Sequence, residues 1–188
     1  MSVGNSLRPI PTGGDEAGAA HFPAEVFADV MRANVQYAAS FQGLGLGGRA
    51  AKGLAVITCM DSRIDPLRIV GMAPGDVKIL RNAGARVTDD VLRTLVLATY
   101  LLDVTRVLVL PHTRCKMVGT AEEEIHAMIA EKYGVDTYSM EFRTVEDEVA
   151  ALRRDLQRIR SFPLLPRDLM VGGAVYNVDT GALLPIDA

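Results

Sequence analysis

The stretch Leu54-Ala-Val-Ile-Thr-Cys-Met-Asp-Ser-Arg63 decides the fold and points to the chemistry. It begins as a short apolar run rich in β-branched residues, which is typical of a buried strand. The run ends in a thiol, a carboxylate and a guanidinium at alternate positions, Cys59, Asp61 and Arg63. A buried strand that ends in three reactive side chains predicts a binding site at that end. Other parts of the chain must then supply the partners.

Strand and helix patterns alternate along the rest of the chain. Further strands are expected at residues 77–80, 106–110 and 169–176, with a short edge strand at 138–142. Helices are expected at 23–42, 88–102, 120–132 and from 144 to about 159, with a helical turn after Asp65-Pro66. This alternation predicts one α/β domain over residues 23–188, with a mainly parallel sheet flanked by helices.

Capping signals define some of the helix ends. Thr120 and Glu123 match a capping box, and Gly134 is suited to end the same helix. His126 lies within this helix after a run of acidic residues, and we interpret it as a surface residue. Thr144 is expected to cap the following helix.

Composition excludes several classes of protein. The chain has 188 residues, of which 49% are hydrophobic and 23% charged, as in an ordinary globular domain. The net charge of −3 and scattered basic residues argue against a nucleic-acid or anionic-membrane partner. The longest apolar window, 94–102, is too short to span a bilayer. Residues 1–22 lack the pattern of a signal peptide, so we expect a loosely ordered arm on a cytoplasmic protein.

The chain has only two cysteines, Cys59 and Cys115, and composition alone leaves their role open. They would form a disulfide in a secreted protein, whereas in a reducing cytosol such a pair more often indicates metal binding or catalysis. Consecutive core strands end in Cys59, in Asn82-Ala-Gly84, and in His112 with Cys115. Because parallel strands end at the same edge of a sheet, these residues are expected to meet. Two thiolates and one imidazole suit zinc and leave the fourth tetrahedral position open.

The residues at these strand ends resemble the β-class carbonic anhydrases. Three elements carry the resemblance, and they follow the order of the family: Cys59-Met-Asp61-Ser-Arg63, Arg81-Asn-Ala-Gly84 and His112-Thr-Arg-Cys115. The resemblance covers about residues 23 to 186. The compact chain, the helix start at 87–90 and the C-terminal strand look most like the small actinobacterial members.

The resemblance implies a role for each of five residues. Cys59, His112 and Cys115 would be the ligands of one zinc ion per chain. Asp61 and Arg63 would form a catalytic dyad. Asp61 would tune the zinc-bound hydroxide, and Arg63 would keep Asp61 ionised. In a closed state Asp61 would itself become the fourth zinc ligand.

The same resemblance implies an oligomer and leaves two positions open. It implies a homodimer, or a tetramer, in which the N-terminal helix lies across the partner subunit. Gly84 is a candidate substrate contact, although a turn with satisfied backbone groups accounts for it equally well. Lys116 departs from the family, which usually has glycine after its zinc cysteine, and a glycine there permits special backbone angles.

The expected function is zinc-dependent, reversible hydration of carbon dioxide to bicarbonate and a proton through zinc-bound hydroxide. One alternative is hydrolysis of a related linear molecule, carbon disulfide or carbonyl sulfide, as some relatives perform. Another is a zinc-binding regulatory protein without hydration activity, in which Asp61 closes the site permanently. Arg63 argues against the last alternative, because a purely structural site has no need of a competitor for Asp61.

Overall fold

The computed structural model describes residues 22–41 and 45–187 of the chain. Its contacts divide the chain into two units, residues 1–44 and 45–188, and each is described here by itself. The predicted N-terminal arm lies, apart from Phe22, outside the described residues. The extent of the catalytic domain, from residue 23 onward, stays a prediction.

The first unit contains the helix predicted at 23–42. Helix α1 (Ala28–Ser40) begins later than predicted, since residues 24–27 form turns and the N-cap residue Phe27 has no side chain that can accept a hydrogen bond. Apolar side chains of α1 are exposed, among them Val30, Met31 and Val35. An amphipathic helix of this length gains most of its stability by burying such a face against another surface.

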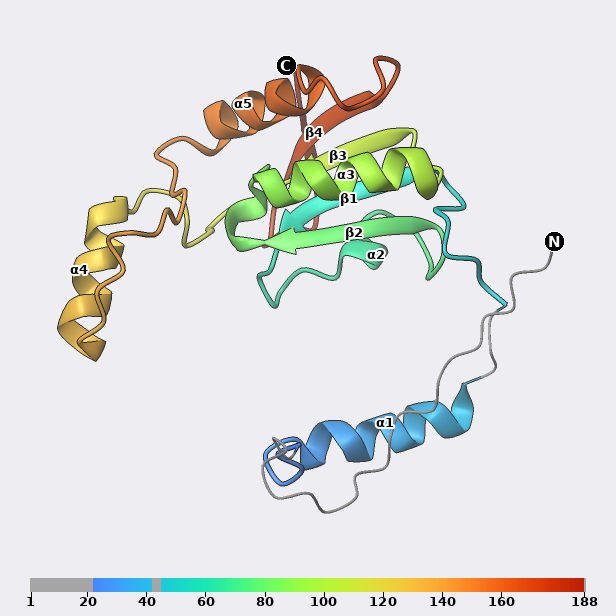
Figure 1. Cartoon of the computed structure of the whole chain (residues 1–188), viewed down its shortest axis with the longest axis horizontal. Helices are drawn as coiled ribbons and strands as arrows, with labels where there is room; N and C mark the ends of the chain where they lie inside the picture. The colour runs from blue at the N-terminus through green and yellow to red at the C-terminus, as the bar shows by residue number, and fades with distance from the viewer. Residues whose placement is uncertain (1–21, 42–44, 188) are drawn as a thin grey trace. The chain divides into compact units, whose positions relative to one another are not determined.

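The second unit is built on a five-stranded sheet within the described residues, in the order β2-β1-β3-β4-β5 (Figure 1). The strands are β1 (Leu54–Cys59), β2 (Val77–Asn82), β3 (Arg106–Leu110), β4 (Met170–Tyr176) and β5 (Leu183–Ile186). The first four pair in parallel, and β5 runs antiparallel to β4. The predicted α/β class with a mainly parallel sheet is therefore confirmed. The sequence interpretation missed β5, which forms from a short apolar run after the turn at 177–181.

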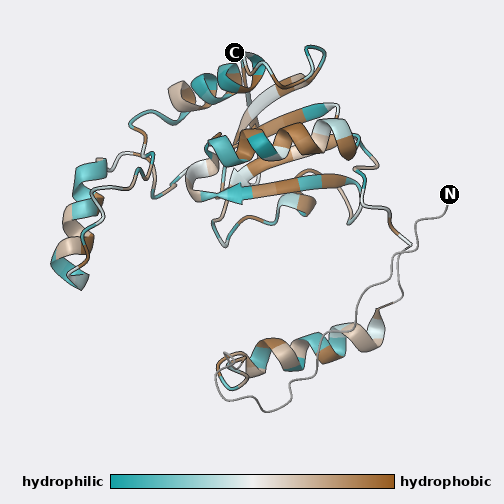
Figure 2. Ribbon diagram, viewed as in Figure 1, coloured by the Kyte–Doolittle hydropathy of each residue, from teal (hydrophilic) through white to brown (hydrophobic). Residues whose placement is uncertain are grey.

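Helices cover the two faces of the sheet unequally. The helices are α2 (Pro66–Ile69), α3 (Asp89–Leu101), α4 (Glu122–Tyr133) and α5 (Glu148–Arg160), and a 3₁₀ turn, η1, spans Ala83–Ala85. Helices α3 and α5 pack on one face, where Ile57 and Val109 point, whereas α2 packs on the other face with Val56 and Leu110. Successive strand residues point to opposite faces, so the apolar side chains of β1 and β3 pack on both faces of the sheet. Figure 2 shows the hydrophobic residues of the sheet in brown.

A glycine lets α5 lie close to the sheet. A Cβ at Gly173 in β4 would lie 2.8 Å from Leu156 Cδ1 and 3.1 Å from Leu152 Cδ1. Leu152, Leu156 and Ile159 of α5 are buried against this face of the sheet. Burial of each such side chain contributes about 1.5–3 kcal/mol.

Two predicted helix starts are wrong. Helix α4 begins after Ala121 with no side-chain cap, so Thr120 and Glu123 do not form a capping box. Helix α5 is capped by Asp147, whose carboxylate accepts the N–H groups of residues 149 and 150, and not by Thr144. For α5 the cause is a parallel bridge between Val118 and Val145. This bridge holds Val145 extended, where the sequence pattern favoured helix.

The segment between Val118 and Val145, which we call the α4 excursion, lies beyond the carboxyl ends of the parallel strands (Figure 1). It contains no strand at 138–142, so the predicted edge strand is wrong. His126 is buried, which corrects its interpretation as a surface residue. Its ring lies 4.7 Å from the Tyr138 ring and 5.0 Å from the Phe142 ring, and Nδ1 is 2.8 Å from Thr137 Oγ1. Within the described part of the chain, no helix combines the length and apolar character needed to cross a bilayer.

Candidate metal centre

The carboxyl ends of β1 and β3 bring the three predicted ligands together. Cys59 is the last residue of β1, and β3 leads through Pro111 into the turn that carries His112 and Cys115. One sulfur from each cysteine and one imidazole nitrogen all lie within 4.8 Å of one another, and all three residues are buried. In the described residues this is the one cluster of three or more such groups with the spacing of a metal site.

The donor atoms fit a tetrahedral zinc ion. The two sulfurs lie 4.0 Å apart, close to the roughly 3.8 Å that Zn–S bonds of 2.3 Å at a tetrahedral angle require. His112 Nδ1 lies 3.0 Å from the carbonyl oxygen of Thr113, a contact in which the protonated Nδ1 donates. His112 Nε2 is buried and has no hydrogen-bond partner. A ligand histidine has this arrangement, because the bonded nitrogen fixes the tautomer and leaves the other lone pair for the metal.

Burial favours the neutral forms of His112 and Cys115. It lowers the pKa of His112, which keeps the imidazole neutral and its Nε2 lone pair available. It also raises the pKa of Cys115 to about 11, so the thiol keeps its proton at neutral pH until a cation displaces it. The amide of Gly84 donates to Cys59 Sγ at 3.4 Å.

Asp61 and Arg63 form a closely bonded pair beside the three donors. Asp61 Oδ1 accepts the backbone N–H and the Nε–H of Arg63, both at 2.9 Å, and Oδ2 accepts from Nη2 at 2.7 Å. These hydrogen bonds hold the pKa of Asp61 well below its usual range. Asp61 Oδ2 also lies 3.8 Å from His112 Nε2. The carboxylate is therefore ionised and adjacent to the candidate ligand nitrogen.

Arg81 fixes the backbone of this strand end, a role that the sequence interpretation did not assign. Its Nε donates to the carbonyl oxygen of Cys59 at 2.9 Å, and its Nη2 donates to that of Asp61 at 2.7 Å. The amide of Met60 donates to the carbonyl oxygen of Asn82 at 3.0 Å. A hint was present in the sequence, since Arg81 precedes the Asn-Ala-Gly turn on the neighbouring strand end.

Gly84 lies at the site within a turn that requires glycine-like angles. Its φ of 75° is in the left-handed region, and an added Cβ would lie 3.1 Å from Met117 Cβ. Asn82 closes this turn by accepting from the amide of Arg86 at 2.8 Å and donating to its carbonyl oxygen at 2.7 Å. The Gly84 amide is directed at Cys59 Sγ. A substrate contact by Gly84 stays a prediction.

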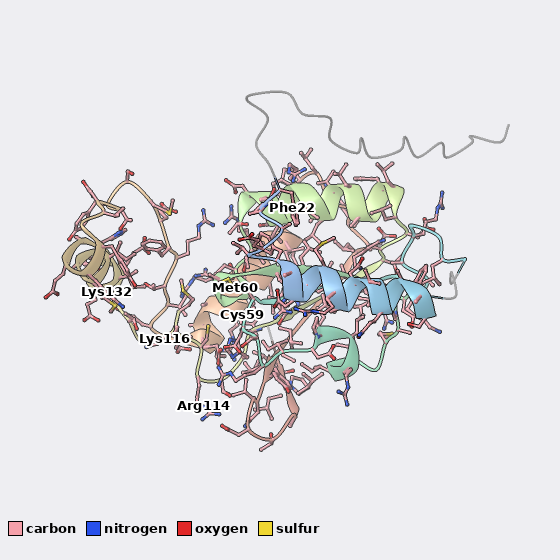
Figure 3. All side chains as sticks on the ribbon, turned by 90° about the horizontal axis from the view of Figure 1, so that it is seen from below. Phe22, Cys59, Met60, Arg114, Lys116 and Lys132 are labelled. Atoms are coloured by element: carbon pink, nitrogen blue, oxygen red, sulfur yellow. The ribbon has the colours of Figure 1, made fainter. Side chains whose placement is uncertain are left out.

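The backbone at Lys116 needs no glycine. Lys116 is exposed and does not have a positive φ, whereas Arg114, two residues earlier, has a φ of 57°. The turn that carries the two later donors is tied to the end of β4, because the Thr113 amide donates to the carbonyl oxygen of Tyr176 at 3.0 Å. The departure from the family at residue 116 therefore places a charged side chain near the site without straining it. In Figure 3, Cys59 lies among packed side chains, and Arg114 reaches the outside.

Comparisons with known proteins agree with this geometry. A family model described as carbonic anhydrase matches residues 54–183. Beta-carbonic anhydrase 1 of Mycobacterium tuberculosis is 35% identical over 156 residues, which cover 82% of this chain and 94% of that protein. A carbon disulfide hydrolase of Acidianus sp. is 30% identical, over 69% of this chain and 75% of that protein. The crystal structure of a carbonic anhydrase from Streptococcus mutans has a TM-score of 0.81 at 34% identity, covering 86% and 97% of the two chains. The chain belongs to the β-class carbonic anhydrase family.

Proposed function

We propose that this protein binds one zinc ion per chain through Cys59, His112 and Cys115, and interconverts carbon dioxide and bicarbonate. The observation that carries the proposal is the buried, unpartnered Nε2 of His112 beside two buried thiols. A buried polar atom without a partner costs about 1–3 kcal/mol, and a metal bond would offset that cost. The ordinary alternative, a satisfied core histidine, would have a protein partner at that nitrogen.

Bound zinc would supply a water molecule with a pKa lowered toward neutrality, which is the source of the nucleophile in zinc lyases. Asp61 would orient that water, because its Oδ2 lies beside His112 Nε2 and is ionised. A carboxylate with so low a pKa keeps no proton at neutral pH. It would therefore act as a hydrogen-bond acceptor that orients a water lone pair toward carbon dioxide. We expect hydration to increase with pH above neutrality, as the nucleophile forms.

Arg63 would determine which of two positions Asp61 takes. In this structure Arg63 engages both carboxylate oxygens of Asp61. If the pair separates, Asp61 is near enough to His112 Nε2 to take the fourth ligand position itself, the closed state that we expected from the resemblance. Arg63 therefore favours the arrangement in which the site stays open to substrate.

Zinc content and carbon dioxide hydration, measured together, test the proposal. We expect one zinc per chain, and stopped-flow hydration that Asp61→Asn lowers about a hundredfold without loss of zinc. Glu141→Gln, an exposed acidic control in the α4 excursion, should change neither. Full activity in Asp61→Asn would disprove the role of Asp61. One zinc per chain with no hydration at any pH would favour a zinc-binding regulatory protein instead.

A second candidate is hydrolysis of carbon disulfide or carbonyl sulfide. The named relative from Acidianus sp. supports it at 30% identity, and the same donor set would serve either reaction. Both reactions need a linear substrate with an electrophilic carbon beside an activated water. Release of hydrogen sulfide from carbon disulfide at a rate comparable to hydration would favour this candidate.

We further propose a homodimer or tetramer in the cytoplasm. The exposed apolar face of α1, which includes Val30, Met31 and Val35, supports assembly, since such a face is stabilised only when another surface covers it. A reducing compartment would keep Cys59 and Cys115 available to a metal. Sedimentation equilibrium of the full chain tests the assembly, and a monomer at micromolar concentration would contradict it.

A further inference from the structure

Arg63 pairs with the carboxylate of Asp61, and a second carboxylate, that of Asp179, is connected to it through Arg114. Its Nη2 donates to Asp61 Oδ2 at 2.7 Å and lies 3.4 Å from the carbonyl oxygen of Arg114. The guanidinium of Arg114 in turn pairs with Asp179, in the turn between β4 and β5. Asp61 is therefore connected through Arg63 and Arg114 to a second carboxylate, that of Asp179.

The backbone fixes Asp179 in this place independently of its ion pair. The Val178 amide donates to Thr113 Oγ1 at 3.2 Å, which ties this turn to the one that carries the ligands. Asn177 Oδ1 accepts the amide of Asp179 at 2.9 Å and that of Thr180 at 3.1 Å. Loss of the Arg114 side chain would thus leave Asp179 where it is, without its neutralising partner.

We propose that Arg114 is a positioning residue that neutralises Asp179 and thereby leaves Arg63 committed to Asp61. Without Arg114, Asp179 would compete with Asp61 for the Arg63 guanidinium. This inference rests on the proposed function, because its effect on catalysis passes through Asp61.

The charges and exposures support such a competition. The Asp179 charge contributes, after Asp61, to raising the pKa of Arg63. The Arg63 side chain is 44% exposed, so it has room to turn toward another acceptor. The interaction is screened by salt over about 8–10 Å, which makes the competition sensitive to ionic strength. Exposed ion pairs add little to stability, so a change in folding is not expected from the loss of this pair.

Two variants separate neutralisation from a purely structural role. We expect Arg114→Gln to lower hydration by zinc-loaded enzyme about fivefold at low salt, with less effect at 0.5 M salt. The double variant Arg114→Gln/Asp179→Asn removes the competitor as well and should recover most of that loss. The control Arg93→Gln breaks an exposed pair with Asp90 on α3 and should leave hydration unchanged.

A second measurement uses the metal-free protein and needs no activity. The Nε–H signal of Arg63 in ¹H–¹⁵N spectra, assigned by its loss in Arg63→Lys, should shift in Arg114→Gln and return in the double variant. A double variant as impaired as the single one in both measurements would overturn the proposal, as would an unchanged Arg63 signal in Arg114→Gln. If the wild type lacks hydration activity, the proposed function fails, while the Nε–H signal still decides whether Asp179 competes for Arg63.

Discussion

Two buried histidines in the same unit differ in their surroundings, and the difference separates a candidate metal ligand from a packed core histidine. His112 lies at the end of β3, and its Nε2 has no protein partner beside two thiols. His126 lies in the α4 excursion, where its Nδ1 meets Thr137 Oγ1 and aromatic rings stack against it. Burial alone therefore does not identify a ligand. The distinguishing feature is a buried nitrogen without a partner, surrounded by other donors.

The largest effect should come from exchanging these two histidines for alanine. His112→Ala removes one of three donors, so we expect zinc content to fall below one-tenth per chain and hydration to fall to background. His126→Ala should keep its zinc and activity but lose about 2–3 kcal/mol of stability, because it leaves a cavity between aromatic rings. Metal analysis and urea unfolding check the two results. Equal zinc contents in the two variants would remove the distinction.

The next effect concerns the proton that a metal must displace at the same site. Burial raises the pKa of Cys115 to about 11, so this thiol is protonated throughout the neutral range. Metal binding then releases that proton, and we expect affinity to increase about tenfold per pH unit from this group alone. Competition with a chromophoric chelator between pH 6 and 8 measures the slope. A slope that Cys115→Ser leaves unchanged would mean that Cys115 is not a ligand.

The strand-end site was predictable because backbone ladders fix it. Parallel pairing aligns Thr58 of β1 with Leu110 of β3, so the residues that follow each strand must meet at one edge. A short apolar run is enough to identify such a strand. The positions of the donor residues then follow from where the strand ends. The meeting of Cys59, His112 and Cys115, and most of the sheet, could therefore be anticipated from the sequence.

The helix of the α4 excursion and its end at Gly134 were predicted, but the expected strand at 138–142 and the expected exposure of His126 were wrong, because side chains from distant positions decide them. The Glu122 carboxylate accepts the amides of Phe142 and Arg143, so these groups have no need of a strand partner. The bridge between Val118 and Val145 likewise overrides local helix signals. These contacts form between segments that are distant in the sequence. Local helix or strand propensity and residue spacing therefore do not predict them. The burial of His126 follows from the same contacts.

Glu148 tests whether every unpartnered buried atom indicates a ligand. Its Oε1 is buried without a partner, yet no cluster of metal donors includes it in the described residues. It lines a cavity of about 20 Å³, room for about one water molecule, next to the ion pair of Arg86 and Asp155. We therefore expect that Glu148 is not a metal ligand and that its ionised form destabilises the folded state.

Burial, with a smaller contribution from Asp147, raises the pKa of Glu148 from 4.5 to about 7. The folded state favours the protonated form, so its stabilising contribution is full below pH 4.5 and is lost as pH rises through 7. Glu148→Gln keeps that contribution, and we expect it to exceed wild type by about 1–2 kcal/mol at pH 8, allowing for solvent screening. Urea unfolding at pH 5 and pH 8 measures the difference. A difference that does not grow with pH would contradict this pKa.

The smallest effect should come from the carboxylate that organises the α4 excursion. Glu122 accepts the amides of Phe142 and Arg143 at 2.8 and 3.0 Å. Glu122→Gln keeps one acceptor oxygen but loses the charge, so we expect a local loss of about 1 kcal/mol, seen as faster hydrogen exchange at these two amides. Glu123→Gln, its exposed neighbour, is the matched control. Because the Glu122 carboxylate does not contact the turn that carries His112 and Cys115, zinc content should stay unchanged in both variants. A fall in zinc content with Glu122→Gln would show that the α4 excursion and the metal centre are one cooperative structure. The two regions would then differ only in how well the sequence predicts them.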